Sequence, residues 1–354
     1  EETGKDKVLK TIAELEKLDD VVYAGPDYVL TVASNTPDDP YYTDGTQWAI
    51  TKLRLPDAWD ITTGSASVTV AVIDSGIDAD HPDLLGRINS TKSRDFTSGE
   101  EEIPVGVIDD FGHGTAVAGV IGAIGDNGIG ITGVCWNVKL ISLKIINSEG
   151  KGLSSNAIKA INYAELWSIP IINFSVRGIG TNSYDEAMRQ AINSYSGLFV
   201  CAAGNDTANV DTNTIYPANY NFSNMIVVGA SDEDDAKCYF SNYGQTKVDL
   251  FAPGAGIYMT SSTGGYITDS GTSFAAPYVA GVAALLLSMD PSLTAEELKA
   301  IIERNVYEVD GLADYCATGG RLNAVQALSD EALHTYTTCS QWTEWYHRIY
   351  CSDC

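Results

Sequence analysis

The sequence has 354 residues, of which 44% are hydrophobic, so it can bury one large core. We therefore expect one α/β domain with small appendages. Its 47 acidic residues against 21 basic ones give a formal net charge of -26, which would repel nucleic acid and anionic membranes. No run of roughly 18 apolar residues occurs, so membrane insertion is not expected. The first residues lack the features of a signal peptide, and we expect that any such peptide is missing from this sequence.

The N-terminal segment predicts a helix followed by a strand. Apolar residues recur at helical spacing within 8–18, and 21–32 has the pattern of extended chain. The polar stretch 34–40 contains two prolines and marks a boundary. We therefore place a domain junction near Ser34.

From residue 68 onward, short apolar strands alternate with helices. We predict strands at 68–73, 138–144, 169–174, 198–202, 226–230 and 248–251, and helices after His113, near 154–167 and near 183–195. Strands that are apolar on both faces and separated by helices imply a doubly wound, mostly parallel sheet flanked by helices. In such sheets the functional residues gather at the carboxyl ends of the strands.

Three polar residues stand at positions suited to catalysis. Asp74 directly follows the first strand, His113 opens a helix between small residues, and Ser273 begins a helix that is apolar nearly all round. Singly, Asp74 could terminate a strand and Ser273 could be a helix N-cap. His81 is the remaining rival base, and we interpret it as a loop histidine. Together the three supply the nucleophile, base and orienting carboxylate that acyl transfer requires.

Asn205 is a fourth candidate, because it follows the buried strand at 198–202. Its side-chain amide could donate a hydrogen bond to the oxyanion of a tetrahedral intermediate, with the backbone N–H of Ser273 as the second donor. A structural asparagine in a turn is the alternative.

These four segments resemble the signature blocks of the subtilisin family. They read Val-Ile-Asp-Ser-Gly-Ile-Asp at Asp74, Gly-His-Gly-Thr-Ala-Val-Ala-Gly at His113, Ala-Ala-Gly-Asn at Asn205 and Gly-Thr-Ser-Phe-Ala-Ala-Pro at Ser273. The likeness extends from about Asp39 to Leu328, and 36–60 looks closest to the thermitase-like branch.

The resemblance implies a serine endopeptidase with protein or peptide substrates. Ser273 would attack the peptide carbonyl, His113 would transfer the proton, and Asp74 would orient the imidazole. An extended substrate would add as a strand between two edges of a cleft. Those edges would be Gly150, Lys151 and Gly152 on one side and Ser175, Val176 and Arg177 on the other. The primary specificity pocket would be walled by Ala202, Ala203 and Gly204, with Ile215 near its base.

Three positions depart from the family's usual pattern. Arg177 replaces the glycine of the family's usual Ser-Leu-Gly. A bulky cation at this position could narrow the cleft or favour acidic peptides. Ala116 replaces the second His of His-Gly-Thr-His, which leaves His113 intact. Phe274 replaces a common Met and so removes a thioether open to oxidation beside the nucleophile.

The loop 125–131 resembles the family's metal-binding loop and implies a structural calcium ion, since calcium prefers hard oxygen ligands. By resemblance, the side-chain ligands would be Asp39, Asp83 and Asn127, and the backbone ligands Ile129 and Ile131. A glycine-rich turn without an ion is the alternative.

Residues 1–33 resemble the second half of the family's inhibitory propeptide, which would make the enzyme a zymogen cleaved by itself between roughly Val32 and Thr36. The catalytic domain would then span 34–330, followed by a cysteine-rich tail at 331–354. We expect a monomer that is secreted or held at the cell surface.

Six of the seven cysteines fall into two groups. Cys135 and Cys201 lie in apolar runs and are predicted to be buried thiols. The others near the C-terminus, Cys316, Cys339, Cys351 and Cys354, suggest a disulfide-bonded tail with one thiol unexplained. That tail could be a cap, a partner-binding appendage or the stump of a further domain.

Two rival functions are a catalytically silent binding module and a nucleotide-binding α/β protein. The first is disfavoured because all three triad residues are present. The second has one possible fingerprint, Gly128-x-Gly130-x-x-Gly133, but this follows a predicted helix and precedes a strand, the reverse of what phosphate binding requires.

Overall fold

The computed structural model describes residues 35–97, 108–177 and 186–330, together with Lys17, Leu333 and two short strands near the C-terminus. Those strands, β12 (Tyr336–Thr337) and β13 (Tyr350–Cys351), pair antiparallel. The chain divides into two compact units, Glu1–Ser34 and Asn35–Cys354, and the fold below is that of the second. The predicted propeptide and most of the predicted tail lie outside the described residues.

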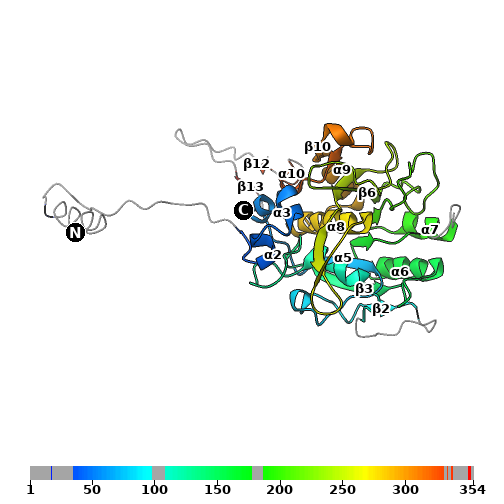
Figure 1. The fold of residues 1–354 in the computed structure, drawn as a ribbon, viewed down its shortest axis with the longest axis horizontal. Coiled ribbons are helices and arrows are strands. Elements are labelled where there is room, and N and C mark those ends of the chain that lie inside the picture. Colours follow the sequence, from blue (N-terminus) through cyan, green and yellow to red (C-terminus); the bar gives the residue numbers. More distant parts are fainter. Residues whose placement is uncertain are drawn as a thin grey trace. The chain divides into compact units, whose positions relative to one another are not determined.

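A nine-stranded sheet forms the centre of the second unit (Figure 1). Its strands run in the order β10 (Tyr307–Glu308), β11 (Gly320–Arg321), β7 (Leu250–Pro253), β6 (Met225–Ser231), β5 (Leu198–Ala202), β4 (Ile171–Phe174), β1 (Thr69–Asp74), β3 (Lys139–Lys144) and β2 (Arg94–Asp95). All neighbours are parallel except β10 and β11. The predicted doubly wound, mostly parallel sheet is therefore confirmed.

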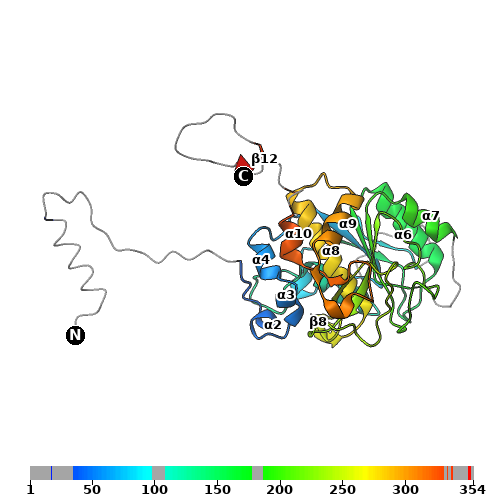
Figure 2. The same ribbon diagram turned by 90° about the horizontal axis from the view of Figure 1, so that it is seen from above.

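Helices cover both faces of the sheet, as Figures 1 and 2 show. One face packs against α5 (His113–Gly122), α8 (Thr272–Met289), α9 (Ala295–Arg304) and α10 (Ala324–Leu328), and the other against α6 (Ser154–Leu166) and α7 (Glu186–Ser194). In β1, Val70 and Val72 face the first group of helices, while Ala71 and Ile73 face the second. Because both faces are covered, the strands read as continuous apolar runs.

The helix α8 is the central buried helix of the fold. Among the described residues it alone is long and apolar enough to cross a membrane, with a mean hydropathy of 1.5, but 83% of it is buried inside the protein. It packs against β4, β5, β6 and β7. Its composition is therefore that of a core helix.

Several elements were not predicted. They include the short helices α2 (Pro40–Thr43), α3 (Trp48–Lys52) and α4 (Leu55–Trp59), the 3-10 turns η1 (Pro82–Leu84) and η2 (Asp310–Leu312), and the hairpin of β8 (Ile257–Thr260) with β9 (Tyr266–Asp269). This hairpin leads directly into α8. It is attached to α5, because the Thr260 hydroxyl donates to the Thr115 carbonyl at 2.6 Å.

One sequence interpretation needs correction. Cys316 is a free thiol buried in the core, so it does not belong to a disulfide-bonded tail; Cys135, Cys201 and Cys238 are also free and buried. His81 lies in a loop before η1, as interpreted from the sequence, and is fully buried. Its Nδ1 accepts from the Asp83 N–H at 3.1 Å and its Nε2 lies 2.8 Å from the Gly265 carbonyl.

The sheet changes direction at β1. β1 pairs with β3 on one side and with β4 on the other. The strands β2 and β3 extend the sheet to one side of β1, and β4 with the later strands of this sheet extends it to the other, so the winding reverses here. A crevice forms outside the carboxyl ends of strands at such a switch point. Asp74 is the last residue of β1 and stands at that crevice.

Candidate active site

The Asp74 carboxylate holds the imidazole of His113. The Nδ1 atom of His113 lies 2.9 Å from both carboxylate oxygens, and the Ser75 N–H donates to Oδ1 at 2.7 Å. Asp74 is 1% exposed, so its interaction with His113 is little screened by water. A neutral imidazole with its proton on Nδ1 leaves Nε2 free to accept a proton.

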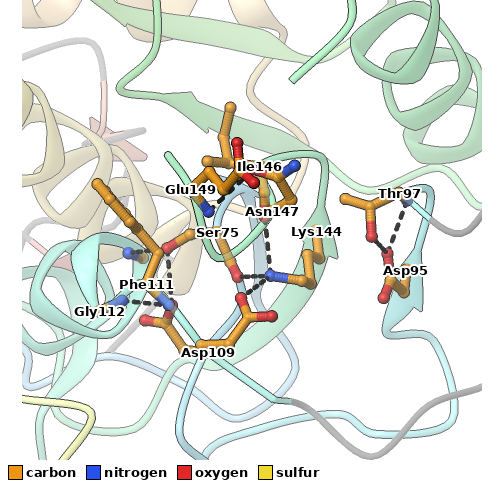
Figure 3. Close-up of polar contacts among 12 residues, drawn as sticks. Ser75, Asp95, Thr97, Asp109, Phe111, Gly112, Lys144, Ile146, Asn147 and Glu149 are labelled. Carbon is orange, nitrogen blue, oxygen red and sulfur yellow. Dashed lines mark hydrogen bonds and ion pairs between the residues drawn. The ribbon is translucent and has the colours of Figure 1, made fainter. Parts of the chain in front are cut away.

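A second carboxylate, Asp109, organises the first turn of α5 (Figure 3). It accepts hydrogen bonds from the backbone N–H groups of Gly112 (2.7 Å) and Thr115 (2.8 Å) and from the hydroxyls of Ser75 (2.8 Å) and Thr115 (2.6 Å). It thereby supplies acceptors for N–H groups that have no partner within the helix. His113 is the first residue of that helix, so Asp109 fixes the position of the main chain that carries the imidazole.

The pKa of His113 is raised above its ordinary value of 6.5. Burial acts in the opposite direction, because it disfavours the charged imidazolium. The carboxylates of Asp74, Asp109 and Asp269 together outweigh burial and favour the protonated form.

Ser273 is the second residue of α8 and is held by a reciprocal contact with Ser175. Pro277 has no N–H, so the Ser273 carbonyl lacks the donor that would normally follow it by four residues. The Ser175 hydroxyl donates to this carbonyl at 2.8 Å, and the Ser273 hydroxyl donates to the Ser175 carbonyl at 3.1 Å. The main chain of Ser273 is thus fixed, while its hydroxyl can rotate.

The imidazole and the serine come from neighbouring helices. α5 packs against α8, and the His113 ring lies 5.3 Å, centroid to centroid, from the ring of Phe274, the residue after Ser273. The Ser273 hydroxyl points to Ser175 here, so a proton transfer to His113 requires its rotation. Catalytic hydrogen bonds are often formed only when substrate is bound.

The amide of Asn205 has a fixed orientation. Its Oδ1 accepts from both the N–H and the hydroxyl of Thr272, each at 2.9 Å, and the Gly204 N–H donates to the same hydroxyl at 3.0 Å. The Asn205 NH₂ group is therefore the end left to face a ligand. A Cβ atom at Gly271 would lie 3.4 Å from that nitrogen. The NH₂ group therefore lies beside the main chain of Gly271, which is two residues before Ser273 in the sequence.

A cavity of about 830 Å³ extends from Asp74 and His113. Of the predicted cleft residues, it is lined by Gly150, Gly152, Ser175, Val176 and Arg177. Most of its remaining lining was not predicted and is largely apolar, with Phe111, Leu153, Phe174, Met188, Tyr216 and Tyr220 among it. The bridge between Ile146 and Gly152 shapes one edge of this cavity.

The other predicted cleft residues are not among those that line this cavity. Lys151 is exposed and pairs with Glu149 at 3.0 Å, and Ile215 precedes the lining residue Tyr216. Ala202, Ala203 and Gly204 are buried at the end of β5, next to Asn205.

Arg177 is paired with a carboxylate. Its guanidinium lies 2.5 Å from Asp206, the residue after Asn205, and their side chains are 50% and 36% exposed. The ion pair connects one predicted edge of the substrate cleft to the segment that follows the predicted pocket wall, and it reduces the positive charge available to a substrate.

The predicted calcium ligands come together around the loop 125–131. Asp39 and Asp83 are both fully buried. Asp39 accepts from the Asp126 N–H at 2.7 Å, and Asp83 accepts from the Asn127 amide at 3.1 Å and the Ile131 N–H at 2.9 Å. Burial, with a smaller contribution from Asp83, raises the pKa of Asp39 to about 6.

The chemistry of this set fits a hard cation. Two buried carboxylates that repel each other are stabilised by a bound metal ion. The Asn127 nitrogen faces Asp83, so its oxygen would face an ion only after the amide turns over. Within the described ranges, no group of three or more His, Cys, Asp or Glu side chains could hold a metal, so the remaining ligands would be amide and carbonyl oxygens such as those of Ile129.

Residues 65–331 match the model of the subtilase family. The chain belongs to this family. Among curated subtilases, thermitase from Thermoactinomyces vulgaris is 36% identical over 294 residues, covering 83% of this chain and 99% of that protein. The thermophilic serine proteinase of Bacillus sp. strain AK1 is 36% identical over 312 residues, covering 87% and 73%.

Solved structures agree with this assignment. A protease from Pseudoalteromonas arctica PAMC 21717 matches with a TM-score of 0.70 and 29% identity, covering 83% of this chain and 99% of that chain. A cold-adapted subtilisin-like serine proteinase matches with a TM-score of 0.61 and 32% identity, covering 72% and 86%. This subtilase is therefore a serine endopeptidase, and no observation favours the catalytically silent alternative.

Proposed function

We propose that Ser273, His113 and Asp74 hydrolyse peptide bonds through an acyl-enzyme, with Asn205 stabilising the oxyanion. The contact between Asp74 and His113, with Nδ1 at 2.9 Å from both carboxylate oxygens, is the observation that carries this proposal. It fixes the tautomer in which Nε2 can remove the Ser273 proton.

In the proposed mechanism, the Ser273 oxygen forms a bond to the substrate carbonyl carbon while its proton passes to Nε2. The oxyanion is stabilised by the Asn205 NH₂ group and the Ser273 N–H, which has no intrahelical partner in the first turn of α8. Collapse of this intermediate breaks the peptide bond, and His113 gives the proton to the leaving amine. A water molecule then attacks the acyl-enzyme by the same steps.

The assignment is tested by peptide hydrolysis. We expect the wild-type protein to cleave casein and a chromogenic peptide amide, while Ser273→Ala and His113→Ala each lose about 10⁵- to 10⁶-fold in kcat. Ser270→Ala is the matched control, since it removes an exposed hydroxyl three residues away. Activity that survives in Ser273→Ala would refute the assignment.

We also propose that substrates bind as an extended strand along Gly150, Lys151 and Gly152 on one side and Ser175, Val176 and Arg177 on the other. The apolar lining of the cavity supports a preference for apolar side chains in the positions that enter it. Ala202, Ala203 and Gly204 would form the wall of the primary pocket near Asn205, with Ile215 at its base.

A structural calcium ion is a further part of the proposal. Asp39, Asp83 and Asn127 would hold it through side chains, and Ile129 and Ile131 through carbonyl oxygens. The ion would offset the repulsion between the two buried carboxylates and stabilise the loop that precedes β3.

Finally, we infer that residues 1–33 are an inhibitory propeptide and that the mature enzyme is a monomer acting outside the cell. The acidic composition and the cysteines of the tail support extracellular action. Ser273→Ala should keep residues 1–33 attached, whereas the wild type should lose them by cleavage between roughly Val32 and Thr36. Normal removal in Ser273→Ala would exclude autoprocessing.

A further inference from the structure

Lys144 is a buried lysine that the proposed mechanism does not use. It is the last residue of β3, is 7% exposed, and lies opposite Asp74 in the parallel register of β1 and β3. A buried ammonium is unfavourable unless its charge is paired and its donors are satisfied. What it binds therefore indicates what it does.

Its Nζ atom has three acceptors from three segments of chain, as Figure 3 shows. These are the Ser75 carbonyl at 2.5 Å, the Asp110 carboxylate at 2.6 Å and the Ile146 carbonyl at 2.7 Å. An ammonium has three N–H donors, so all of them are used. Asp110 supplies the compensating charge.

Each acceptor belongs to a segment that carries part of the candidate active site. Ser75 follows Asp74, and its N–H donates to the Asp74 carboxylate. Asp110 lies in the turn that leads into α5, three residues before His113. Ile146 lines the substrate cavity and is bridged to Gly152 at the predicted substrate edge.

Other contacts also restrict the chain around Ser75. The Ser75 hydroxyl donates to Asp109 at 2.8 Å and accepts from the Gly114 N–H at 2.9 Å. The next residue, Gly76, has φ +120°, and a Cβ there would lie 2.3 Å from the Ile108 carbonyl. The carbonyl held by Lys144 thus belongs to a peptide unit packed between the segments that carry the base and its cap.

We propose that Lys144 is a positioning residue for peptide-bond hydrolysis, binding together the segments that carry Asp74, His113 and one edge of the substrate cleft. This inference rests on the function proposed above. Lys144 acts through the main chain of Ser75 and Ile146 and through Asp110, and touches neither the substrate nor the nucleophile. Without its ammonium, two buried carbonyls lose their donor and Asp110 loses its cation.

The β3 strand offers a matched control in Lys139, its first residue. The Lys139 ammonium also binds one backbone carbonyl, that of Gly86 at 2.7 Å, but at the opposite end of the strand. Lys144→Met and Lys139→Met therefore remove the same group from the same strand, one at the active-site end and one away from it. Asp110→Asn is a milder second variant, because Asp110 is 43% exposed and two acceptors of Lys144 remain.

The experiment measures kcat and KM on a peptide amide, the rate of fluorophosphonate labelling, and the melting temperature of each variant. We expect Lys144→Met to lose about 100-fold in kcat/KM, mainly through kcat, with labelling slowed in parallel, as for a misplacement of about 1 Å in reacting groups. Asp110→Asn should show a smaller loss in the same direction at a nearly unchanged melting temperature. Lys139→Met should stay within about twofold of the wild type even if its melting temperature falls.

The inference is overturned if folded Lys144→Met keeps kcat within about twofold of the wild type, or if Lys139→Met loses as much as Lys144→Met. If Lys144→Met does not fold, Asp110→Asn decides: reduced kcat with wild-type melting supports the inference, and unchanged kcat refutes it. A wild-type protein that is neither labelled nor active would instead refute the proposed function.

Discussion

At the scale of single residues, Thr272 orients the Asn205 amide that we propose as the oxyanion donor. An asparagine presents either an acceptor or two donors, and only the donors stabilise an oxyanion. The two Thr272 donors on Oδ1 hold the amide in the orientation that the proposed mechanism requires. This preorganisation removes a reorganisation cost from the reacting state.

Replacement of Asn205 should therefore reduce kcat far more than it changes KM. We expect Asn205→Ala to lose about 10²- to 10³-fold in kcat, the effect known for the corresponding donor of subtilisin. Thr272→Val should lose less, because the amide remains but its orientation is freer. Asn213→Ala, which alters an exposed loop asparagine, is the control. Steady-state kinetics showing equal kcat for Asn205→Ala and Asn213→Ala would contradict the role.

The pair of Arg177 and Asp206 should set the charge preference of the cleft. Asp206→Asn frees the Arg177 guanidinium, so peptides with Glu near the scissile bond should gain about three- to tenfold in kcat/KM relative to Gln peptides, as expected for a partly exposed charge pair. Arg177→Ala/Asp206→Asn should abolish this gain. A charge preference that is the same in all three proteins would show that neither residue contacts the substrate.

At the scale of elements, α5 links the position of His113 to its protonation. Asp109 caps the helix and also raises the pKa of His113, while Asp269 on β9 raises that pKa without contributing to the cap. Variants of these two carboxylates can therefore separate the effect on the pKa of His113 from the effect on the helix cap. Since His113 must be neutral to act as the proposed base, activity should fall as pH decreases through its raised pKa.

The acid limb of kcat/KM should accordingly lie above pH 6.5 in the wild type and move to lower pH in both Asp109→Asn and Asp269→Asn. Only Asp109→Asn should also lose stability, by about 1 kcal/mol, through the weakened cap. The raised pKa of His113 stabilises the fold below pH 6.5, and this contribution is lost as pH rises through that pKa. pH-rate profiles with thermal melts measure both effects, and an unshifted limb in Asp269→Asn would contradict the electrostatic part.

The elements also show which features local sequence can predict. Asp74, His113, Ser273 and Asn205 each sit beside a strand end or helix start with its own local pattern, so they could be found from the sequence. The Asp109 cap could have been found too, because acidic residues before a helix are a known start signal.

Contacts between distant segments could not be predicted in this way. Lys144 binds a carbonyl 69 residues away, and Tyr266 donates to Asp83 across 183 residues. The apolar lining of the cavity likewise comes from five separate segments of chain. Such partners are determined by tertiary packing, which leaves no periodic or spacing signal in the sequence.

At the scale of the whole molecule, the excess of negative charge makes cation binding a stability question. Asp39 and Asp83 place two of the 47 acidic side chains in the interior. Without a cation, ionisation of Asp39 is opposed, because burial raises its pKa from the ordinary value of 3.8 to about 6. The ion-free protein should therefore lose stability as pH rises from about 4 to 6.

Calcium should remove this loss. At hundredfold excess over Kd, calcium adds about 2.7 kcal/mol and raises the melting temperature by about 5 °C or more, with a larger effect at pH 7 than at pH 5. Calorimetry with calcium and with a chelator measures this difference in melting temperature. Asp39→Asn and Asp83→Asn should lose the calcium-dependent gain, whereas Asp126→Asn in the same loop should keep it. Equal melting with and without calcium at pH 7 would refute the site.

The most direct test of the account is to map a covalent fluorophosphonate adduct by mass spectrometry. We predict a single adduct on Ser273 in the wild type, none in Ser273→Ala, and strongly slowed labelling in His113→Ala. An adduct on another serine, or undiminished labelling in Ser273→Ala, would contradict the claim that the serine at the start of α8 is the nucleophile of this protease.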